Sequence, residues 1–312
     1  MSAQARVASY RHEALLWRGT DDFLAGCVPF IRDGVAADEP VMVATTRERV
    51  SLLHDTLGAD ATGVRFVDME QLGANPARII PAWADFVRDA GGRVARGIGE
   101  PIWAGRSAAE IAECQLHESL LNLALSEDTP LWLRCPYDVE GLPGSVIEEA
   151  ERSHPVVTDT AQASTRTQPY AGPRQAWAAF TSALPEPRGV EVVVEFGQTD
   201  LRRVREAVVV AGERCGVPVD RVADLALAVH ELAANSVLHG GGHGVLRIWC
   251  ESRALLCEVT DQGQVLDPLT GRHHVEPEGS SGRGLWMVNH LCDLVQLRSS
   301  DAGTVVRVHT WT

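Results

Sequence analysis

The chain divides into two halves that differ in the order of their expected helices and strands, and this difference constrains the fold more than any other feature. The segment 158–173, TDTAQASTRTQPYAGP, is rich in Thr, Ala, Ser, Gln and Pro and holds few large aliphatic side chains. Such a composition is typical of a linker. It predicts one domain over residues 1–157 and a second over 174–312, and 312 residues suffice for two domains.

In the first half, short apolar runs alternate with amphipathic stretches. Strands and helices that alternate at this rhythm favour an α/β fold with a mostly parallel sheet. The expected strands cover 13–17, 40–45, 64–69, 93–98 and 131–135, and the expected helices cover 21–37, 47–57, 76–91 and 107–125.

The second half has a strand first, then two helices, then pairs of apolar strands with short gaps between them. Helices that precede antiparallel hairpins favour an α+β sandwich. The expected strands cover 191–196, 244–250, 254–261, 294–299 and 304–311, and the expected helices cover 199–214, 219–238 and 283–292.

The charged residues exclude several classes of function. The formal net charge is -14, which argues against nucleic acid as a direct partner because phosphate backbones require a basic face. All basic residues are Arg and none is Lys. A Walker A loop and an ordinary protein-kinase site both need a Lys at the phosphates, so both are excluded.

The cysteines and the hydropathy of the chain indicate in which cellular compartment the protein works. The 7 cysteines are scattered without a Cys-x-x-Cys pair, and most have apolar neighbours. Reduced, buried thiols in a cytosolic protein fit this pattern. The N-terminus lacks the layout of a signal peptide, and no apolar run approaches the length of a membrane span. We therefore expect a cytoplasmic protein with no membrane segment.

The segment VHELAANSVLHGGG, 229–242, places two polar residues on an otherwise apolar helix. Glu231 and Asn235 are four residues apart and share one helix face, where burial without partners is costly. An Asn oxygen suits Mg²⁺, and a carboxylate one turn away suits removal of a proton beside a terminal phosphate. A hydrogen-bonded pair without a ligand is the alternative.

Three further segments follow in order along the chain. Asp261-Gln-Gly263 ends a strand, where the Asp can accept a hydrogen bond from an exocyclic amine such as that of adenine. The run from Gly279 to Gly284 opens a helix whose N–H groups suit phosphate oxygens. Gly303-Thr304 opens the last strand. Each segment alone is typical of a turn or loop, but the four in this order favour one nucleotide site.

Over about 176–312, these segments resemble the N, G1, G2 and final boxes of the Bergerat-fold (GHKL) ATP-binding superfamily, and within it the anti-sigma factor/serine kinase group. The resemblance implies an α+β sandwich that binds ATP and Mg²⁺. It implies Glu231 as general base, Asn235 as Mg²⁺ ligand and Asp261, above Gly263, as adenine reader. Residues 264–281 would form the ATP lid. The remaining candidates are His239, Ser281, Gly282, Arg283, Gly284 and Leu285 near the phosphates and Thr304 near the adenine.

One position departs from the family pattern. The fullest G1 pattern is Asp-x-Gly-x-Gly, and here the last Gly is replaced by Val265 in the segment DQGQV. Anti-sigma kinases tolerate change at this position more than histidine kinases do.

Polar residues in the first half follow the ends of expected strands. Glu100 and Trp103 lie at the end of one strand, and Cys135 and Asp138 lie at the end of another. Ligand sites of parallel α/β sheets lie at the carboxyl ends of the strands, so these four residues predict a sensory pocket. Two ordinary loops are the alternative.

Glu113 and His117 stand one turn apart on the expected helix 107–125. This spacing can hold a metal ion. More often, such a pair is a solvated pair on a helix surface.

The segments HEALLW, FVDM, GIGEPIWAGR, ECQLHE and CPYD, within about 10–157, resemble the MEDS sensory domain. The resemblance implies a RecA-like α/β fold without a working P-loop, which senses an unidentified ligand. A MEDS half joined to an anti-sigma kinase half resembles one group of actinobacterial anti-sigma regulators. It implies a cytoplasmic regulator that sequesters a sigma factor, phosphorylates a Ser or Thr of a STAS-domain antagonist and pairs as a homodimer.

Two other functions stay open. ATP binding alone, without phosphoryl transfer, could set the lid conformation and the affinity for a partner, and Val265 favours this alternative. A sensor histidine kinase would need a helical hairpin with a phosphorylated His before the ATP domain. The region 158–190 is too short and too rich in Pro to supply that hairpin.

Overall fold

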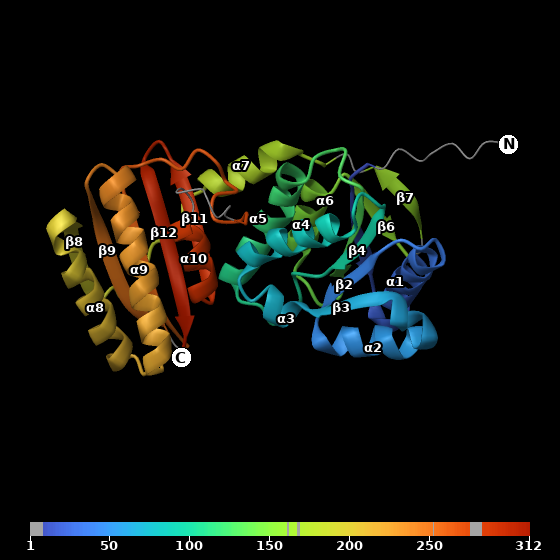
Figure 1. Ribbon diagram of the computed structural model, residues 1–312, viewed down its shortest axis with the longest axis horizontal. Coiled ribbons are helices and arrows are strands. Elements are labelled where there is room, and N and C mark those ends of the chain that lie inside the picture. Colours follow the sequence, from blue (N-terminus) through green and yellow to red (C-terminus); the bar gives the residue numbers. More distant parts are fainter. Residues whose placement is uncertain (1–8, 161, 167–168, 252, 275–282) are drawn as a thin grey trace. The chain divides into compact units, whose positions relative to one another are not determined.

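The computed structural model describes residues 9–160, 162–166, 169–251, 253–274 and 283–312. Contacts between residues divide the chain into two compact units, with the border between Ala176 and Trp177. Figure 1 shows a separate sheet in each unit. None of the helices in the described ranges has the length and apolar character needed to cross a membrane.

The first unit is built on a seven-stranded sheet with the order β3-β2-β4-β5-β1-β6-β7. Strands β1 to β6 pair in parallel, and β7 pairs antiparallel with β6. Strands β2 and β4 are buried throughout, as expected for a parallel sheet covered on both faces. The strands are β1 Arg11–Trp17, β2 Val41–Thr45, β3 Val64–Asp68, β4 Ala95–Gly99, β5 Leu131–Asp138, β6 Val156–Asp159 and β7 Gln162–Arg166.

Helices cover the two faces of this sheet because alternate residues of each strand point to opposite sides. Leu15 lies against Gly26 of α1, whereas Gly97 lies against Trp83 of α4 on the other face. Apolar side chains of α1 pack against those of β1 and β2 and form the core on one face of the sheet. The helices are α1 Gly19–Ala36, α2 Arg47–Leu57, α3 Met69–Leu72, α4 Ile79–Asp89, α5 Ala108–Ala124 and α6 Gly144–Ser153, with 3₁₀ helices at Gly58–Gly63 and Pro76–Arg78.

Helix α5 begins at a reciprocal cap and buries several polar side chains. The Ser107 hydroxyl accepts the N–H of Glu110, and the Glu110 carboxylate accepts the N–H of Ser107. With the helix started there, the residues from Glu113 to Leu121 include several polar side chains that are buried. The expected solvated pair of Glu113 and His117 is therefore wrong, since both residues are buried.

The segment 158–173, expected as a linker, is not a free connection in the structure. It contains β7, which adds the last strand to the first sheet, and the N–H of Ala171 donates to the carbonyl oxygen of Arg152. A short polar stretch suits an edge strand because such a strand has only one neighbour. Helix α7 (Pro173–Thr181) follows and contains the border between the units.

The second unit is built on a five-stranded antiparallel sheet with the order β11-β12-β10-β9-β8. Helix α9 packs beside α8 and α10 and over β9 and β10. A parallel sheet in one unit and an antiparallel sheet in the other confirm the expected fold class. The elements are β8 Val192–Gly197, a 3₁₀ helix Gln198–Asp200, α8 Leu201–Arg214, α9 Val219–His239, β9 His243–Glu251, β10 Ala254–Asp261, α10 Arg283–Leu291, β11 Leu294–Ser300 and β12 Gly303–Trp311.

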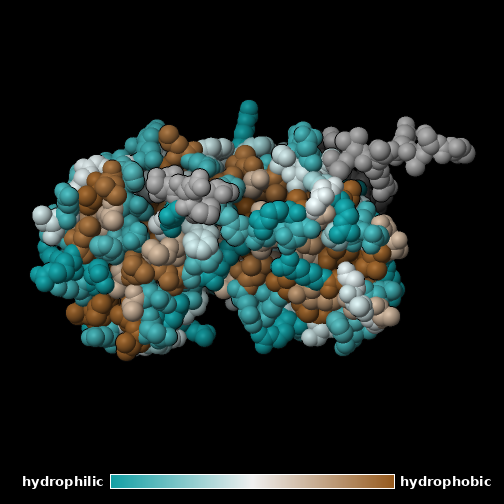
Figure 2. Space-filling model, viewed as in Figure 1, coloured by the Kyte–Doolittle hydropathy of each residue, from teal (hydrophilic) through white to brown (hydrophobic). Residues whose placement is uncertain are grey.

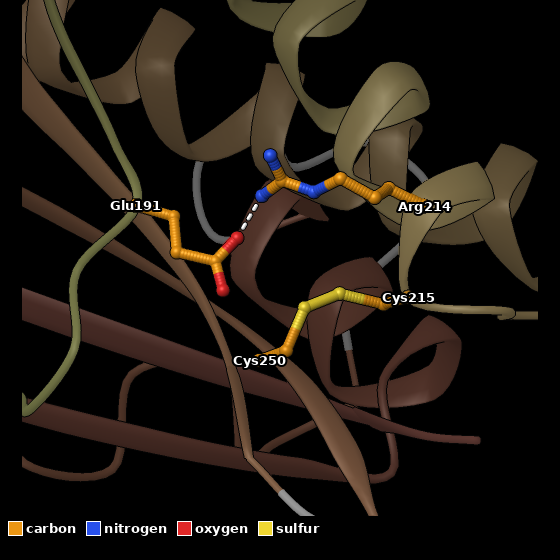
Figure 3. The surroundings of a disulfide bond; sticks show 4 residues. All are labelled: Glu191, Arg214, Cys215 and Cys250. Carbon is orange, nitrogen blue, oxygen red and sulfur yellow. Dashed lines mark hydrogen bonds and ion pairs between the residues drawn. A yellow bond between two sulfur atoms is a disulfide. The ribbon is translucent and has the colours of Figure 1, made fainter.

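The expectation that all cysteines are reduced is wrong for one pair. Cys215, at the end of α8, forms a disulfide with Cys250 of β9, and their Cα atoms are 6.4 Å apart. Figure 3 shows this bond beside an ion pair between Arg214 and Glu191. Because the two cysteines are 35 residues apart, their pairing depends on the tertiary fold and could not be read from local spacing. The other five cysteines lie outside this disulfide and are buried.

Reduction of this disulfide is expected to lower the free energy of unfolding of the second unit. A cross-link that closes a loop of 35 residues contributes about 3–4 kcal/mol, mainly by restricting the unfolded chain. Urea unfolding of the protein with and without reductant measures the difference. The variant Cys215→Ser is the control and should not respond to reductant. Equal midpoints for the oxidised and reduced wild type would contradict the prediction.

Candidate functional site

The polar pair of α9 lies directly against the start of α10. Glu231 and Asn235 are half-buried, while the flanking Leu232 and Ala233 are buried. A Cβ placed on Gly284, the second residue of α10, would lie 3.2 Å from Asn235 Nδ2 and 3.4 Å from Glu231 Oε2. Glycine at 284 therefore allows the first turn of α10 to approach the pair closely. The first and third segments of the predicted site are thus brought together.

The carboxylate of Asp261 is held in a fixed orientation at the end of β10. Its Oδ2 accepts the hydroxyl of Ser236 at 2.6 Å, and its Oδ1 accepts the N–H of Gly263 at 2.8 Å. Each oxygen of a carboxylate has a second lone pair, so the group can accept a further hydrogen bond from a ligand. The residue is only half-buried, which leaves room for such a donor.

Glycines next to Asp261 keep its surroundings free of side chains. A Cβ on Gly240, which follows α9, would lie 2.6 Å from Asp261 Oδ1, and one on Gly263 would lie 2.7 Å from the carbonyl oxygen of His239. Gly303 has a φ of 115°, and a Cβ there would overlap the carbonyl oxygen of Asp261. Larger residues at these positions would displace the backbone on which the carboxylate depends.

A row of hydroxyl groups fixes the backbone that follows Asp261. Thr304 Oγ1 lies 2.8 Å from the carbonyl oxygen of Gly263 and 3.0 Å from Ser299 Oγ, and Ser299 Oγ accepts the N–H of Val265 at 2.8 Å. Each hydroxyl can thus donate in one direction and accept from the other. Val265, which replaces a glycine of the family pattern, sits in backbone that β11 and β12 hold in place.

The other predicted residues occupy different positions around this centre. His239 is the last residue of α9, and its side chain is exposed. Arg283 is the exposed first residue of α10, and Leu285 is half-buried. Ser281 and Gly282 lie outside the described residues, as does the part of the expected lid from 275 onward.

The described part of the expected lid packs onto α10. Asn289 Nδ2 donates to the carbonyl oxygen of Gly271 at 2.9 Å. A Cβ on Gly271, whose φ is 77°, would lie 2.9 Å from the Cβ of Leu285. This portion of the segment is therefore anchored beside the helix that is expected to bind phosphates.

Ser236 is a site residue that the sequence did not suggest. It is buried on the face of α9 that points toward β10 and donates to Asp261, which lies 25 residues further along the chain. A single small polar residue directly after Asn235 was the only signal, and Ser inside a helix usually bonds its own backbone.

Replacing Ser236 with Ala is expected to weaken ATP binding by about tenfold, because Asp261 loses one of the two bonds that orient it. Loss of a hydrogen bond to a charged group costs about 1–3 kcal/mol. Calorimetric titration of the variant and the wild type with ATP measures the change. Ser51→Ala, at an exposed hydroxyl of α2 in the first unit that also bonds the carbonyl oxygen four residues earlier, is the matched control. An unchanged affinity in Ser236→Ala would contradict the role given to this bond.

The four residues of the expected sensory pocket do not converge on one point. Glu100 is buried and paired with Arg49 of α2, and Cys135 lies on the opposite face of the sheet, toward α5. Burial raises the pKa of Glu100 to about 7 against the opposing effect of Arg49, and the charge of Asp138 adds to the rise. Glu100 and Asp138 thus share one face, and Cys135 does not.

Trp103 lies apart from both Glu100 and Cys135 in its contacts. The guanidinium of Arg106 lies 3.8 Å from the centre of its ring, and Arg106 in turn donates to the carbonyl oxygen of Gly73. Asp138 accepts the N–H groups of Glu140 and Gly141 and so shapes the turn after β5. Trp103 and Asp138 therefore have local structural contacts in addition to any role in sensing.

Comparison with known proteins gives matches in both units. The family described as MEDS, the MEthanogen/methylotroph, DcmR Sensory domain, matches residues 11–155. The family described as Histidine kinase-like ATPase domain matches residues 194–310. These matches confirm the two resemblances drawn from the sequence.

The chain is also similar to a protein kinase and to a solved structure. It is 30% identical to the serine-protein kinase RsbW of Halalkalibacterium halodurans over 134 residues, which are 39% of this chain and 82% of that kinase. The crystal structure of the RsbU and RsbW domains of Rv1364c from Mycobacterium tuberculosis is 17% identical with a TM-score of 0.29. That match covers 38% of this chain and 32% of the other, so this chain spans about a third of that protein.

Proposed function

Because this chain belongs to the family of the serine-protein kinase RsbW and carries a MEDS domain ahead of its histidine kinase-like ATPase domain, we propose that it is a cytoplasmic, ATP-dependent regulator of transcription. The second unit binds Mg-ATP, sequesters a sigma factor and phosphorylates a Ser or Thr of a STAS-domain antagonist. The first unit senses a ligand and modulates these activities. The observation that carries the proposal is the close approach of Gly284 to Glu231 and Asn235.

The adenine is read by Asp261. Ser236 and Gly263 each donate one hydrogen bond to its carboxylate, so the remaining lone pairs point in a defined direction. The exocyclic amine of adenine donates to this carboxylate, whereas guanine presents a carbonyl oxygen at the same place and would be repelled. The glycines at 240 and 263 leave space for the base.

The phosphates lie at the start of α10. The N–H groups of its first turn and the positive end of its dipole favour phosphate oxygens. Asn235 provides an amide oxygen next to this turn, which suits Mg²⁺ because that ion takes few protein ligands and prefers oxygen. When bound, Mg²⁺ supplies charge neutralisation on the transferring phosphoryl group.

Glu231 acts as the general base. The hydroxyl of the antagonist's Ser or Thr attacks the γ-phosphorus and gives its proton to the Glu231 carboxylate. The bond from the γ-phosphorus to the bridging oxygen breaks, and ADP leaves. Glu231 is half-buried, so it is shielded on one side and accessible to a protein substrate on the other. Proton removal of this kind accelerates a reaction by about 10²–10⁴-fold.

Exposed apolar side chains in the second unit support binding to a protein partner or to a second copy. Large exposed apolar residues in the described ranges all lie in this unit, and Figure 2 shows brown patches over it. Apolar surface of this kind is typical of interaction sites. The residues are Trp177, Val193, Val209, Val210, Val219, Leu227, Leu238, Leu266 and Trp311.

A second function is an ATP-gated binding switch without phosphoryl transfer. Val265 favours it because the fullest family pattern has a glycine there. In that case, ATP would set the affinity for the sigma factor, and no antagonist would be phosphorylated.

Incubation with labelled Mg-ATP tests the proposed function. The purified chain is mixed with each STAS-domain protein of the source genome, and the phosphorylated residue is located by mass spectrometry. Label on a Ser or Thr of one antagonist supports the kinase. Label on no antagonist, with Mg-ATP binding intact, would leave the binding switch in its place. Acid-labile label on the chain itself would indicate a histidine kinase.

A further inference from the structure

Four buried side chains from distant parts of the sequence meet in the first unit. His12 lies in β1, Glu118 in α5 and Cys135 in β5, and His154 caps the end of α6. One ligand atom of each residue lies within 4.8 Å of the others. His12 and Cys135 come close together because β1 and β5 are neighbouring strands, with Ala14 opposite Cys135. The kinase function proposed for the second unit does not use these residues.

The contacts within this cluster are close. His12 Nε2 lies 3.1 Å from Glu118 Oε2 and 3.4 Å from Cys135 Sγ. His154 Nε2 lies 3.3 Å from the same oxygen of Glu118. Two imidazole nitrogens and a thiol therefore surround one carboxylate.

The hydrogen bonds on the far side of each imidazole determine which nitrogen carries its proton. Asn122 Nδ2 donates to the carbonyl oxygen of Ser153 at 2.8 Å, so Asn122 Oδ1 faces His12 Nδ1 at 3.0 Å and requires a proton there. His154 Nδ1 lies 2.8 Å from the carbonyl oxygen of Ala150 and also carries a proton. In neutral rings, both Nε2 atoms then direct lone pairs toward Glu118.

Lone pairs that face one another in a buried site need either a proton or a metal ion between them. All four residues are buried, with Glu118 and His154 at 1% and 0% exposure. Glu118 Oε1 has no hydrogen-bond partner within the part of the chain that the structure describes. If Cys135 gives up its proton on binding an ion, its thiolate and the Glu118 carboxylate together carry two negative charges, which one divalent ion would neutralise.

We propose that His12, Glu118, Cys135 and His154 bind one Zn²⁺ ion. Two nitrogens, one sulfur and one oxygen form a donor set that suits tetrahedral Zn²⁺. Metal–ligand bonds of about 2.0–2.3 Å place neighbouring ligand atoms about 3.3–3.6 Å apart. The contacts of 3.1 to 3.4 Å fit this spacing, and all four ligand atoms lie within 4.8 Å of one another, so small side-chain movements suffice to complete the site.

The surroundings of the two histidines fit the same assignment. Histidines that bind a metal usually donate their other N–H to a carbonyl or amide oxygen, which fixes the ring. Asn122 and Ala150 supply those acceptors. With four protein ligands the site is closed, so the ion joins β1, β5, α5 and α6 as a structural centre of the sensory domain.

Metal content and Co²⁺ spectra of the full chain test the proposal. We expect about one Zn²⁺ per purified chain. Co²⁺ in its place should give tetrahedral d–d bands and a thiolate-to-Co²⁺ charge-transfer band. Cys135→Ser should lose the charge-transfer band, whereas Cys114→Ser should keep it, since Cys114 is equally buried but donates to the carbonyl oxygen of Pro101. A band that survives in Cys135→Ser, or disappears in Cys114→Ser, would overturn the assignment.

The wild-type chain decides the question even if Cys135→Ser does not fold. A metal-free protein that shows no charge-transfer band after addition of Co²⁺ would overturn the proposal. Nitrogen NMR of the histidine rings would then show a proton on Nε2 of His12 or His154, as required for an imidazolium paired with Glu118. In the proposed site, both Nε2 atoms bind the ion and carry no proton.

Discussion

Replacing Glu231 with Gln is expected to lower the rate of phosphoryl transfer to the antagonist by at least about 100-fold and to leave the affinity for Mg-ATP nearly unchanged. The amide has almost the same shape as the carboxylate but cannot accept the proton of the attacking hydroxyl. Because Glu231 is half-buried beside Gly284, an isosteric change should preserve the approach of α10. Single-turnover transfer and calorimetric titration measure the two quantities separately.

Glu213→Gln is the matched control for this experiment. Glu213 is exposed on α8, so its replacement should change neither transfer nor ATP affinity. Transfer at the wild-type rate in Glu231→Gln would show that another group removes the proton. Loss of ATP binding together with transfer would place Glu231 in binding instead of catalysis.

Replacing Asp261 with Asn is expected to lower the affinity for ATP by about 100-fold, which corresponds to about 2.7 kcal/mol. An amide in this position turns an N–H group toward either the adenine amine or one of its present donors, Ser236 and Gly263. In each case two donors face one another, and an unsatisfied polar group is left in the site. Competition titrations with ATP and GTP measure the loss and the change in base preference.

Asp301→Asn provides the corresponding control. Asp301 is exposed in the turn between β11 and β12, close to Gly303. Asp301→Asn therefore makes the same chemical change near the site, at a carboxylate that accepts a weak hydrogen bond from Gln264 at 3.4 Å and takes no part in the two hydrogen bonds that orient Asp261. An affinity for ATP in Asp261→Asn equal to that of the wild type would mean that the adenine lies elsewhere.

Most elements of the fold could be predicted because their signals are local. Apolar periodicity over 219–238 predicted α9, observed at Val219–His239, and the apolar run 254–261 predicted β10 with the same bounds. The two halves differ in the order of their expected helices and strands. This difference was enough to predict one parallel and one antiparallel sheet, as observed. Motif order was enough to predict the ATPase domain that the family match confirms.

Features that depend on contacts between distant residues could not be predicted. His12 and Cys135 meet only because β1 inserts between β5 and β6 in the sheet, and sequence spacing gives no strand order. The alternation of strand residues separates Cys135 from Glu100, although Cys135 lies in β5 and Glu100 follows the neighbouring strand β4. On α5, the spacing of Glu113 and His117 favoured a solvated pair and left a metal pair as the alternative, whereas the structure buries both residues and places Glu118 in the cluster.

Short segments and single residues that carry a weak sequence signal were also missed. β7 lies in a stretch that reads as linker, because Gln, Ser and Thr have no apolar pattern. Its position becomes visible only through pairing with β6. Ser236 similarly looks like an ordinary helix residue until Asp261 is placed beside it.

Equilibrium titration of the purified chain with ATP, with Mg²⁺ and with EDTA, tests most directly whether the second unit forms one nucleotide site. We expect saturable binding of one ATP per chain that is much weaker in EDTA, since Asn235 contacts the nucleotide through Mg²⁺. We also expect weak or undetectable binding of GTP, because Asp261 repels the guanine carbonyl. No saturable binding of ATP, or equal binding of ATP and GTP, would contradict the site built from Glu231, Asn235 and Asp261.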